Sequence, residues 1–597
     1  MNISGKDLYA SLTFGYCHLR ENMQKINIIN VFPVADGDTG SNITHTLKSI
    51  LSHTDGSGTV ADISNNFARA ALIGARGNSG MIIAQFFQGF SQIAKEFDEL
   101  TVKALIDSAK AAVAAAYSAV ETPMEGTILT VMRSWANQLS LAEGSDVPIP
   151  IQLRRALRAA RKAEKETTSQ MELLKRYQVV DAGAKAFVSI LEGVDQYILN
   201  PEMTISESEL LVYAAKDLMP SIHTHENSRY RYCTEALLRI DEGQEQNVRE
   251  AVLGLGDSLV IGRYENQMRI HLHTDDPALM FERLGCCSHI EEQKVDDMHM
   301  QQAAVNARLS DTVIVTDSSA DVPQEVVDEL RIYQIPQIIQ IGETSYFDRI
   351  TITAPSLLSI MDSNTHKVSS SMPAIGEIQR HLEFLSQHYE HIVVLSVSSK
   401  LSGTFNTYQL AAKALQEQGV NITIFDTKLN ASAQGLVVEE AARAVARGEK
   451  GQALLQRIKD TAERTTIMVS VQSLQMMVRG GRIPKKLGSL VLKLNLKPLV
   501  GLSPEGGGAF LGIRLSRAGS ITALVSRFMN VYRKKGIQAY GLSYIGSPEL
   551  AFSLAQIVEQ KTGIKPLFVE QASPVIALHA GKGSISLSYI AKRPTTS

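Results

Sequence analysis

The spacing of apolar residues along this 597-residue chain changes character twice, and this limits the folds that the chain can adopt. Residues 1 to about 200 carry apolar residues at helical spacing, as in "LTVKALIDSAKAAVAAAYSAV". From about 205 to 305, segments such as "QMRIHLHT" alternate like the strands of one sheet. From about 311 onward, short strand patterns alternate with helical patterns, which indicates α/β units with a largely parallel sheet.

These patterns predict a multidomain chain, because single cores stop growing beyond about 250–300 residues. We expect an all-α domain at 1–203, an α+β middle domain at 204–306 and an α/β half at 311–597. A division near residue 460 would split that half into two subdomains. The strands expected in it are "TVIVTD", "IPQIIQI", "HIVVLSVS", "ITIFDT", "TTIMVSV", "AYGLSYI" and "ISLSYI".

Charge and composition argue against several classes of protein. The net charge of −3, without any long basic or acidic block, gives no sign of a nucleic-acid partner. No apolar run approaches the roughly 20 residues needed to cross a bilayer, and the N-terminus lacks a secretory pattern. Four cysteines are too few for a disulfide framework, so we expect a soluble protein of the reducing cytoplasm.

The stretch "DGDTGSN" places two carboxylates, Asp36 and Asp38, on either side of one glycine. Mg²⁺ takes hard oxygen ligands and bridges carboxylates to nucleotide phosphates, so a bound cation would explain why these like charges lie so close. Thr39, Ser41 and Asn42 add hydroxyl, amide and backbone N–H groups for a phosphate. An ordinary Asp-Gly turn is the alternative for this stretch taken alone.

Three further loops also place small polar residues before a helix: "GARGNSGMI", "EGTILT" and "VVDAGAKAF". The first turn of a helix exposes unpaired N–H groups that can bind phosphate. Each loop alone is more typical of a helix cap. Four such loops in one helical region favour a nucleotide site.

Together, "FPVADGDTGSN", "GARGNSG", "EGTILT" and "VDAGAKAF" resemble the ATP-binding L domain of the dihydroxyacetone kinase superfamily, closest to the version in bacterial fatty acid kinase. The resemblance spans essentially residues 1–200 and implies an α-helical barrel in which acidic residues hold Mg²⁺ ions against the phosphates of ATP. It makes Asp36 and Asp38 ligands of Mg²⁺, with the amide of Asn30 near the remaining ligand position. The residues that would line the nucleotide are Thr39, Ser41, Asn42, Ser79, Gly80 and Thr127.

Cys233, His271 and His273 raise the question of a second metal. Residues two apart on a strand share a face, so both imidazoles of "IHLHT" could meet one ion. A thiolate and two imidazoles suit Zn²⁺ with its fourth position open, although core packing is the commoner role for such residues. The segments "YCTEALLRI", "LGDSLVI" and "RIHLHTDDPALMFE" resemble the middle domain of fatty acid kinase. That resemblance implies that these three residues bind the metal.

In the α/β half, hydroxyl groups gather where expected strands end, as in "VTDSSADVP", "VSSSMP" and "VSSKLSGTFNT". Ligands of open parallel sheets sit at the carboxyl ends of the strands, and hydroxyls there suit an anionic head group. Helix capping is the alternative for each stretch taken alone. No histidine base can be paired with any of these serines, so a hydrolase is not expected.

The motifs "DSSAD", "SSKLSGT", "RGGRI" and "LHAGKG", in this order over residues 311–592, resemble the DegV family of fatty-acid-binding proteins. The resemblance implies that Ser370, Ser402, Arg482 and His579 surround a fatty acid carboxylate. Ser370 replaces the usual threonine of that family and keeps the hydroxyl group. Two further departures, Met372 in place of a common glutamine and Pro484 in place of a frequent glycine, predict a changed pocket mouth.

These resemblances imply a fatty acid kinase fused to its fatty acid carrier. The expected reaction is ATP-dependent phosphorylation of a bound fatty acid carboxylate to give acyl phosphate and ADP for phospholipid synthesis. The catalytic groups would be Asp36, Asp38, Arg482 and His579. An acyl-phosphate-using acyltransferase at the membrane surface is the expected partner, and a homodimer stays open. The alternatives are a fatty acid carrier with a regulatory kinase half, and a kinase for a small polyol such as dihydroxyacetone.

Overall fold

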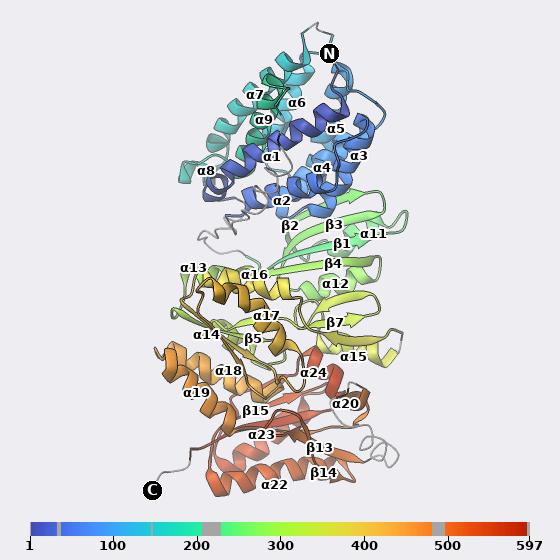
Figure 1. Cartoon of the computed structure of the whole chain (residues 1–597). Coiled ribbons are helices and arrows are strands. Elements are labelled where there is room, and N and C mark those ends of the chain that lie inside the picture. The colour runs from blue at the N-terminus through green and yellow to red at the C-terminus, as the bar shows by residue number, and fades with distance from the viewer. Residues whose placement is uncertain are drawn as a thin grey trace. The chain divides into compact units, whose positions relative to one another are not determined.

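The computed structural model describes residues 2–32, 37–144, 147–203, 205, 229–363, 365–479, 481 and 496–593. The chain forms two compact units, Met1–Val305 and Asn306–Ser597 (Figure 1). The first contains a helical region followed by a mixed sheet, and the second is α/β. The predicted fold class, a multidomain chain with an all-α region, an α+β region and an α/β half, is therefore confirmed.

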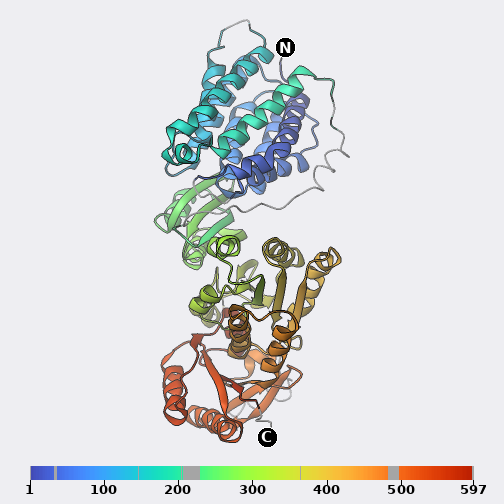
Figure 2. The same ribbon diagram turned by 90° about the vertical axis from the view of Figure 1, so that its left-hand side faces the viewer.

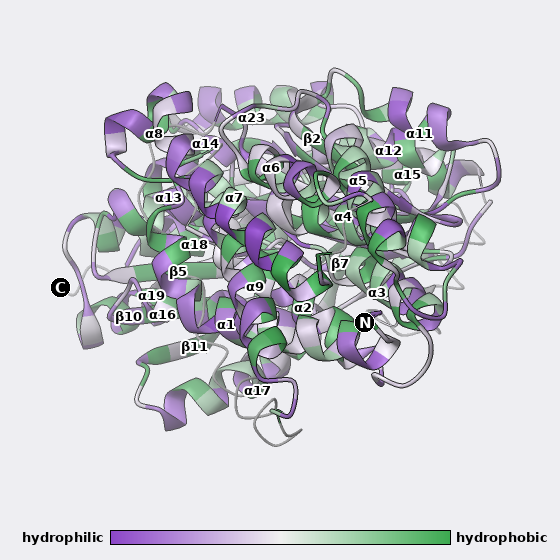
Figure 3. Ribbon diagram, turned by 90° about the horizontal axis from the view of Figure 1, so that it is seen from above, coloured by the Kyte–Doolittle hydropathy of each residue, from purple (hydrophilic) through white to green (hydrophobic). Residues whose placement is uncertain are grey.

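The helical region is one bundle in which consecutive helices pack side by side and the last helix returns to the first. Its helices are α1 (Gly5–Ile28), α2 (Thr39–Ser52), α3 (Val60–Gly74), α4 (Gly77–Ala94), α5 (Val102–Ala119), α6 (Ile128–Ser140), α7 (Ile149–Gln170), α8 (Glu172–Tyr177) and α9 (Ala182–Leu199). Glycines let α1 and α9 approach closely, since a Cβ on Gly193 would lie 2.3 Å from the carbonyl oxygen of Phe14. The position of a helix in this bundle follows its polarity: α7 is mainly hydrophilic, whereas α4 is mainly apolar and packs against α2, α3 and α5 (Figure 3).

The mixed region contains β1 (Tyr232–Arg239), α11 (Glu245–Val252), β2 (Gly256–Tyr264), β3 (Gln267–Thr274), α12 (Pro277–Gly285), β4 (His289–Asp297) and α13 (Met298–Asn306). Its sheet is antiparallel, in the order β2-β3-β1-β4. Both faces of β3 are buried, although its residues alternate between apolar and polar. The reason is that helices α3 and α4 of the bundle pack against β2, where a Cβ on Gly262 would meet Gln85 and Met81.

The second unit contains a parallel sheet in the order β11-β10-β5-β6. Its strands are β5 (Thr312–Asp317), β6 (Tyr333–Ile335), β10 (His391–Ser396) and β11 (Ile422–Asp426). A small antiparallel sheet in the order β8-β7-β9 accompanies it, formed by β7 (Ile338–Ile341), β8 (Thr344–Phe347) and β9 (Val368–Ser371). The helices of this part are α14 (Gln324–Leu330), α15 (Ala354–Ser363), α16 (Ile375–Ser386), α17 (Thr404–Glu417) and α18 (Ala431–Ala446).

The largest sheet of the second unit has the order β14-β13-β12-β17-β15-β16. Its strands are β12 (Thr465–Ser470), β13 (Lys497–Leu502), β14 (Gly508–Arg514), β15 (Ile537–Tyr544), β16 (Val569–Gln571) and β17 (Ile585–Ala591). The helices in this part are α19 (Gly451–Arg464), α20 (Gln475–Arg479), α22 (Arg517–Lys535), α23 (Glu549–Thr562) and α24 (Pro574–Ala580). Figure 2 shows the same elements in a view turned by 90°.

Two details of the predicted α/β half are wrong. The expectation of a largely parallel sheet holds for the first sheet, but in the largest sheet only β15 and β16 pair in parallel. The segment "IPQIIQI" is not one strand, because β6 ends before Pro336 and β7 begins in another sheet at Ile338. Proline has no N–H group to donate to a strand partner, which favours a break there. Within the part of the chain that the structure describes, no helix has the length and apolar character of a membrane span.

Candidate functional site

The start of helix α2 carries the polar groups predicted to face a nucleotide. Asp38 precedes the helix, and its carboxylate makes no capping hydrogen bond. The hydroxyl of Thr39 donates to Oδ1 of the buried Asn30 at 2.6 Å and lies 3.3 Å from the hydroxyl of Ser79 at the start of α4. Asn30, Thr39 and Ser79 therefore come together as expected. Asp36, the other predicted carboxylate, lies outside the described residues.

Two further predicted residues, Ser41 and Asn42, hold α2 in place. The N–H of Ser41 donates to Oδ1 of Asn27, whose amide donates back to the Ser41 hydroxyl at 2.9 Å. Asn42 lies against Gly77, where a Cβ would come within 2.4 Å of Nδ2. At Gly80 a Cβ would lie 2.7 Å from the hydroxyl of Thr46. The first turns of α2 and α4 thus pack in close contact, and only glycine fits at these points.

Thr127 lies at the start of α6, but its hydroxyl donates to the carbonyl of Met124 at 2.7 Å and does not cap the helix. Asp181, which the sequence reasoning did not select, ties this loop to α9. Its carboxylate accepts the N–H of Ala184 at 2.7 Å, and burial raises its pKa to about 6 despite further hydrogen bonds from the N–H groups of Ile128 and Gly183. The loops "EGTILT" and "VVDAGAKAF" therefore meet through one buried carboxyl.

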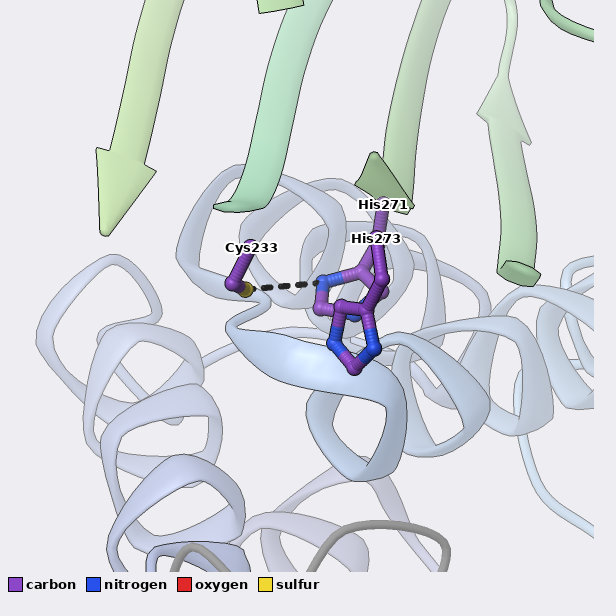
Figure 4. A group of neighbouring side chains, drawn as sticks. All are labelled: Cys233, His271 and His273. Carbon is purple, nitrogen blue, oxygen red and sulfur yellow. Dashed lines mark hydrogen bonds between the residues drawn. The ribbon is translucent and has the colours of Figure 1, made fainter. Parts of the chain in front are cut away.

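Cys233, His271 and His273 form one cluster, and Figure 4 shows their side chains pointing from β1 and β3 toward the ribbon of the helical region. Cys233 pairs with His273 across the two strands, so all three residues lie on the same face of the sheet. Their potential ligand atoms lie within 4.8 Å of one another. Sγ of Cys233 is 3.9 Å from Nδ1 of His271, and both histidines are buried.

The donor set fits a zinc ion. Tetrahedral Zn²⁺ with bonds of about 2.0–2.3 Å separates its ligand atoms by about 3.3–3.8 Å, so side-chain shifts of about 1 Å would close the cluster. Nε2 of His271 is buried and has no hydrogen-bond partner among the described residues. Burial lowers the pKa of His271, which keeps the imidazole in the neutral form that metals bind. Burial also raises the pKa of the Cys233 thiol, and the nearby Asp38 carboxylate adds to this, so a cation is needed to stabilise the thiolate.

A buried charged network that the sequence reasoning missed surrounds this cluster. Glu235 follows Cys233 by two residues on the same face and pairs across the strands with His271. Burial alone would raise the pKa of the Glu235 carboxyl, but Lys294, a hydrogen bond from His271, and Arg269 hold it well below the ordinary value. The alternation of β1 could have indicated Glu235, since its neighbours Cys233 and Leu237 share its face.

In the second unit, two predicted head-group residues meet directly. The hydroxyl of Ser370 on β9 lies 3.0 Å from Nε2 of His579 in α24. Both side chains are partly exposed. Ser402 lies before α17, where its hydroxyl is 2.7 Å from that of the buried Thr404. Arg482 lies outside the described residues.

Met372 connects the loops that carry these serines. Its sulfur accepts a hydrogen bond from the hydroxyl of Thr407 at 3.4 Å, and a Cβ on Gly403 would lie 2.5 Å from the same atom. Met372 is nevertheless exposed. It therefore bridges the end of β9 and the loop of Ser402, the region where the sequence predicted a changed pocket mouth.

The stretch "VTDSSADVP" is occupied in internal structure. The Ser318 hydroxyl donates to Asp348 at 2.5 Å, and the carboxylate of Asp317 accepts the N–H of Val397 at 2.7 Å. The other oxygen of Asp348 accepts the N–H of Val575, in the first turn of the helix that carries His579. Burial raises the pKa of Asp348 to about 7, although Arg349 opposes this. This network fixes α24 relative to β5.

Comparison with known families matches three successive parts of the chain. The family described as "DAK2 domain" matches residues 33–196, the FakA-like middle domain of fatty acid kinase matches 229–305, and "Uncharacterised protein, DegV family" matches 311–592. The protein is thus a multidomain chain with a DAK2 domain, a FakA-like middle domain and a DegV domain. The resemblances inferred from the sequence motifs are confirmed.

Curated relatives match over part of their length. An uncharacterized protein of Staphylococcus saprophyticus is 32% identical over 317 residues, which is 51% of this chain and 56% of that protein. An uncharacterized protein of Staphylococcus haemolyticus is 31% identical over 314 residues, again 51% of this chain and 56% of that protein. The matched part is therefore little more than half of each relative.

Solved structures of DegV proteins are similar to about half of the chain. A DegV family protein from Thermus thermophilus, whose structure concerns fatty acid binding, is 25% identical and covers 47% of this chain and 99% of its own, with a TM-score of 0.44. The Streptococcus pneumoniae fatty acid kinase B3 protein, loaded with linoleic acid, is 17% identical over 47% of this chain and 99% of its own, with a TM-score of 0.43.

Proposed function

We propose that this chain is an ATP-dependent fatty acid kinase that carries its own fatty-acid-binding domain. One observation carries the proposal: a DAK2 domain, a FakA-like middle domain and a DegV domain follow one another in a single polypeptide. The corresponding domains would be residues 1–203, 204–306 and 311–597. Fusion raises the effective concentration of carrier and kinase for each other without any new contact.

In the proposed reaction, a carboxylate oxygen of the fatty acid attacks the γ-phosphorus of ATP. A new oxygen–phosphorus bond forms, and the bond between the γ-phosphorus and the β–γ bridging oxygen breaks. The products are acyl phosphate and ADP, and no proton has to move, because the total charge of reactants and products is equal. Positioning of the phosphates and neutralisation of their charge are the main tasks of the protein in such a transfer.

The N-terminal site would hold ATP and Mg²⁺. Asp36 and Asp38 would bind the metal, which neutralises phosphate charge when bound. The free carboxylate of Asp38 at the start of α2 supports this role, since no helix cap occupies it. The oxygen of Asn30 already accepts the Thr39 hydroxyl, so Asn30 would act mainly by fixing that hydroxyl beside Ser79. The nucleotide would also contact Ser41, Asn42, Gly80 and Thr127.

The middle region would hold Zn²⁺ through Cys233, His271 and His273. A zinc ion with an open position supplies Lewis-acid chemistry when bound. The effect of the Asp38 charge on the Cys233 thiol supports a location of this cluster beside the phosphate loops. The three residues would therefore orient an anionic group next to the nucleotide site.

The DegV-like half would bind the fatty acid. Ser370 and His579 present a hydroxyl and an imidazole nitrogen 3.0 Å apart, a pair suited to a carboxylate. Ser402 and Arg482 would complete the head-group site. The acyl chain would stay in the apolar interior, because exposure to water costs about 0.8 kcal/mol per CH₂ group.

Release of ADP by the purified chain tests this proposal when oleate, oleyl alcohol and dihydroxyacetone are compared at equal concentration. We expect ATP consumption with oleate alone. Consumption with dihydroxyacetone would instead identify a polyol kinase, and oleate binding without consumption would identify a carrier. The expected setting is the cytoplasm, with an acyltransferase at the membrane surface as the user of the acyl phosphate. Sedimentation of the active chain would show whether it is a homodimer.

A further inference from the structure

The loop at the start of α4 is held from outside the helical region by a buried carboxylate. The N–H of Gly77 donates to Oε1 of Glu235 on β1 at 3.0 Å. Gly77 has a φ of +57°, a left-handed conformation that glycine adopts without strain. This N–H thus points out of the helix toward the sheet, and Glu235 is its partner.

A pair of cations fixes Glu235 in this position. Nη2 of Arg269 donates to Oε2 of Glu235 at 3.4 Å, and Nη1 of the same arginine donates to the carbonyl of Ile73 at 2.7 Å. Nζ of Lys294 lies 3.6 Å from Oε1 of Glu235. The side chains of Glu235 and Arg269 are only 2% and 8% exposed. Both ends of the connection between α3 and α4 are therefore bound to one buried ion pair.

The same carboxylate borders the Cys/His/His cluster. Nδ1 of His271 lies 3.7 Å from Oε1 of Glu235, the oxygen that accepts the N–H of Gly77. Carboxylates beside metal-binding histidines orient the imidazole ring and tune its basicity. A continuous set of contacts therefore runs from His271 through Glu235 to Gly77, across residues that are far apart in sequence.

We propose that Glu235 is a positioning residue that couples the Cys233/His271/His273 cluster to the nucleotide loop Gly77–Gly80. The inference rests on the proposed function, because it requires that loop to hold the phosphates of ATP. With the His271 ring fixed by zinc, Glu235 keeps its place against Gly77, and the free N–H groups at the start of α4 keep their direction. Coupling between two binding sites is reciprocal, so nucleotide and zinc should each strengthen the binding of the other.

Titration of Mg²⁺-ADP into the full chain at saturating zinc tests this role. We expect Glu235→Ala to raise the Kd for ADP by on the order of tenfold, as for the loss of a buried charge-assisted hydrogen bond. Glu235→Gln should raise it less, because an amide oxygen still accepts the N–H of Gly77. Glu292→Ala is the matched control, since this carboxylate is 59% exposed and lies 3.8 Å from the same Arg269. The control should bind ADP like the wild type.

A second titration removes the metal. Chelation of zinc from the wild type should weaken ADP binding, and chelation from Glu235→Ala should cause no further loss. The Kd for oleate should stay unchanged in every variant, which separates the effect from general unfolding. If Glu235→Ala does not fold, Glu235→Gln carries the test through its reduced response to zinc.

Three results would overturn the inference. ADP binding by Glu235→Ala at the wild-type Kd would show that the carboxylate does not hold the loop. An equal response to chelation in the wild type and in Glu235→Gln would show that it does not couple the sites. Failure of the wild type itself to bind ADP would refute the proposed function together with the inference, and this outcome is distinguishable because it needs no variant.

Discussion

Replacement of Gly77 by alanine should damage the nucleotide site more than the fold. The left-handed conformation at this residue, with φ of +57°, costs an L-residue about 1–2 kcal/mol. The added Cβ would lie 2.4 Å from Nδ2 and 3.2 Å from Cγ of Asn42, so the amide of Asn42 has to rotate away. Asn42 is an expected contact of the nucleotide phosphates. Loss of a hydrogen bond to a charged group is worth about 1.5–3 kcal/mol, which corresponds to roughly a tenfold to hundredfold higher Kd.

Calorimetric titration of Mg²⁺-ADP measures this Kd, and thermal unfolding measures the effect on the fold. Gly254→Ala is the matched control, because Gly254 has a φ of +73° and a Cβ there would meet no atom within 4 Å. Both variants carry the same kind of backbone strain, but only Gly77→Ala displaces Asn42. An equal rise of Kd in both variants, or an unchanged Kd in Gly77→Ala, would refute the assignment of this loop to the nucleotide.

Three other predictions concern separate parts of the chain. Arg482→Ala should weaken binding of oleate by on the order of 2 kcal/mol and leave oleyl alcohol unaffected, since only the acid needs a charge partner; equal weakening of both ligands in titrations would remove Arg482 from the head-group site. Metal analysis should find about one zinc per chain in the wild type and much less in Cys233→Ser, and unchanged content would exclude the thiolate as a ligand. Burial raises the pKa of Asp348 to about 7, so the stability that its neutral form provides is complete below about pH 4 and is lost as the pH rises through about 7. The unfolding temperature of Asp348→Asn should therefore increase relative to the wild type between pH 4 and pH 8, by an effect of at most about 4 kcal/mol, whereas parallel pH profiles would contradict the burial argument.

The candidate metal cluster illustrates what a sequence can predict. The two-residue spacing of His271 and His273 places both side chains on one face of a strand in any sheet, and the structure has them there. The alternation of β3 also predicts that this polar face meets water, but the face is buried. The cause lies in helices more than 150 residues away, including the loop of Gly77 that binds Glu235. Such a long-range contact leaves no local pattern, so Glu235 and Arg269 were missed.

Strand direction is the second feature that the local pattern could not provide. Buried strands of parallel and antiparallel sheets have similar apolar runs, so the runs "TTIMVSV" and "ISLSYI" predict members of a parallel sheet. In the structure β12 and β17 pair antiparallel. The hairpin of β13 and β14 was not predicted, because glycine and polar residues interrupt its apolar pattern. Helical segments were easier to predict, since their period of 3.6 residues persists over several turns.

The central claim is that this chain transfers a phosphoryl group from ATP to a fatty acid carboxylate. Hydroxylamine added to a reaction of the full chain with ATP and oleate converts any acyl phosphate into a hydroxamate, which mass spectrometry can quantify against the ADP released. The proposal predicts oleoyl hydroxamate and ADP in equal molar amounts, and neither product from Asp38→Ala, although that variant should still bind oleate. Release of ADP without hydroxamate, or the same yield from Asp38→Ala, would contradict it.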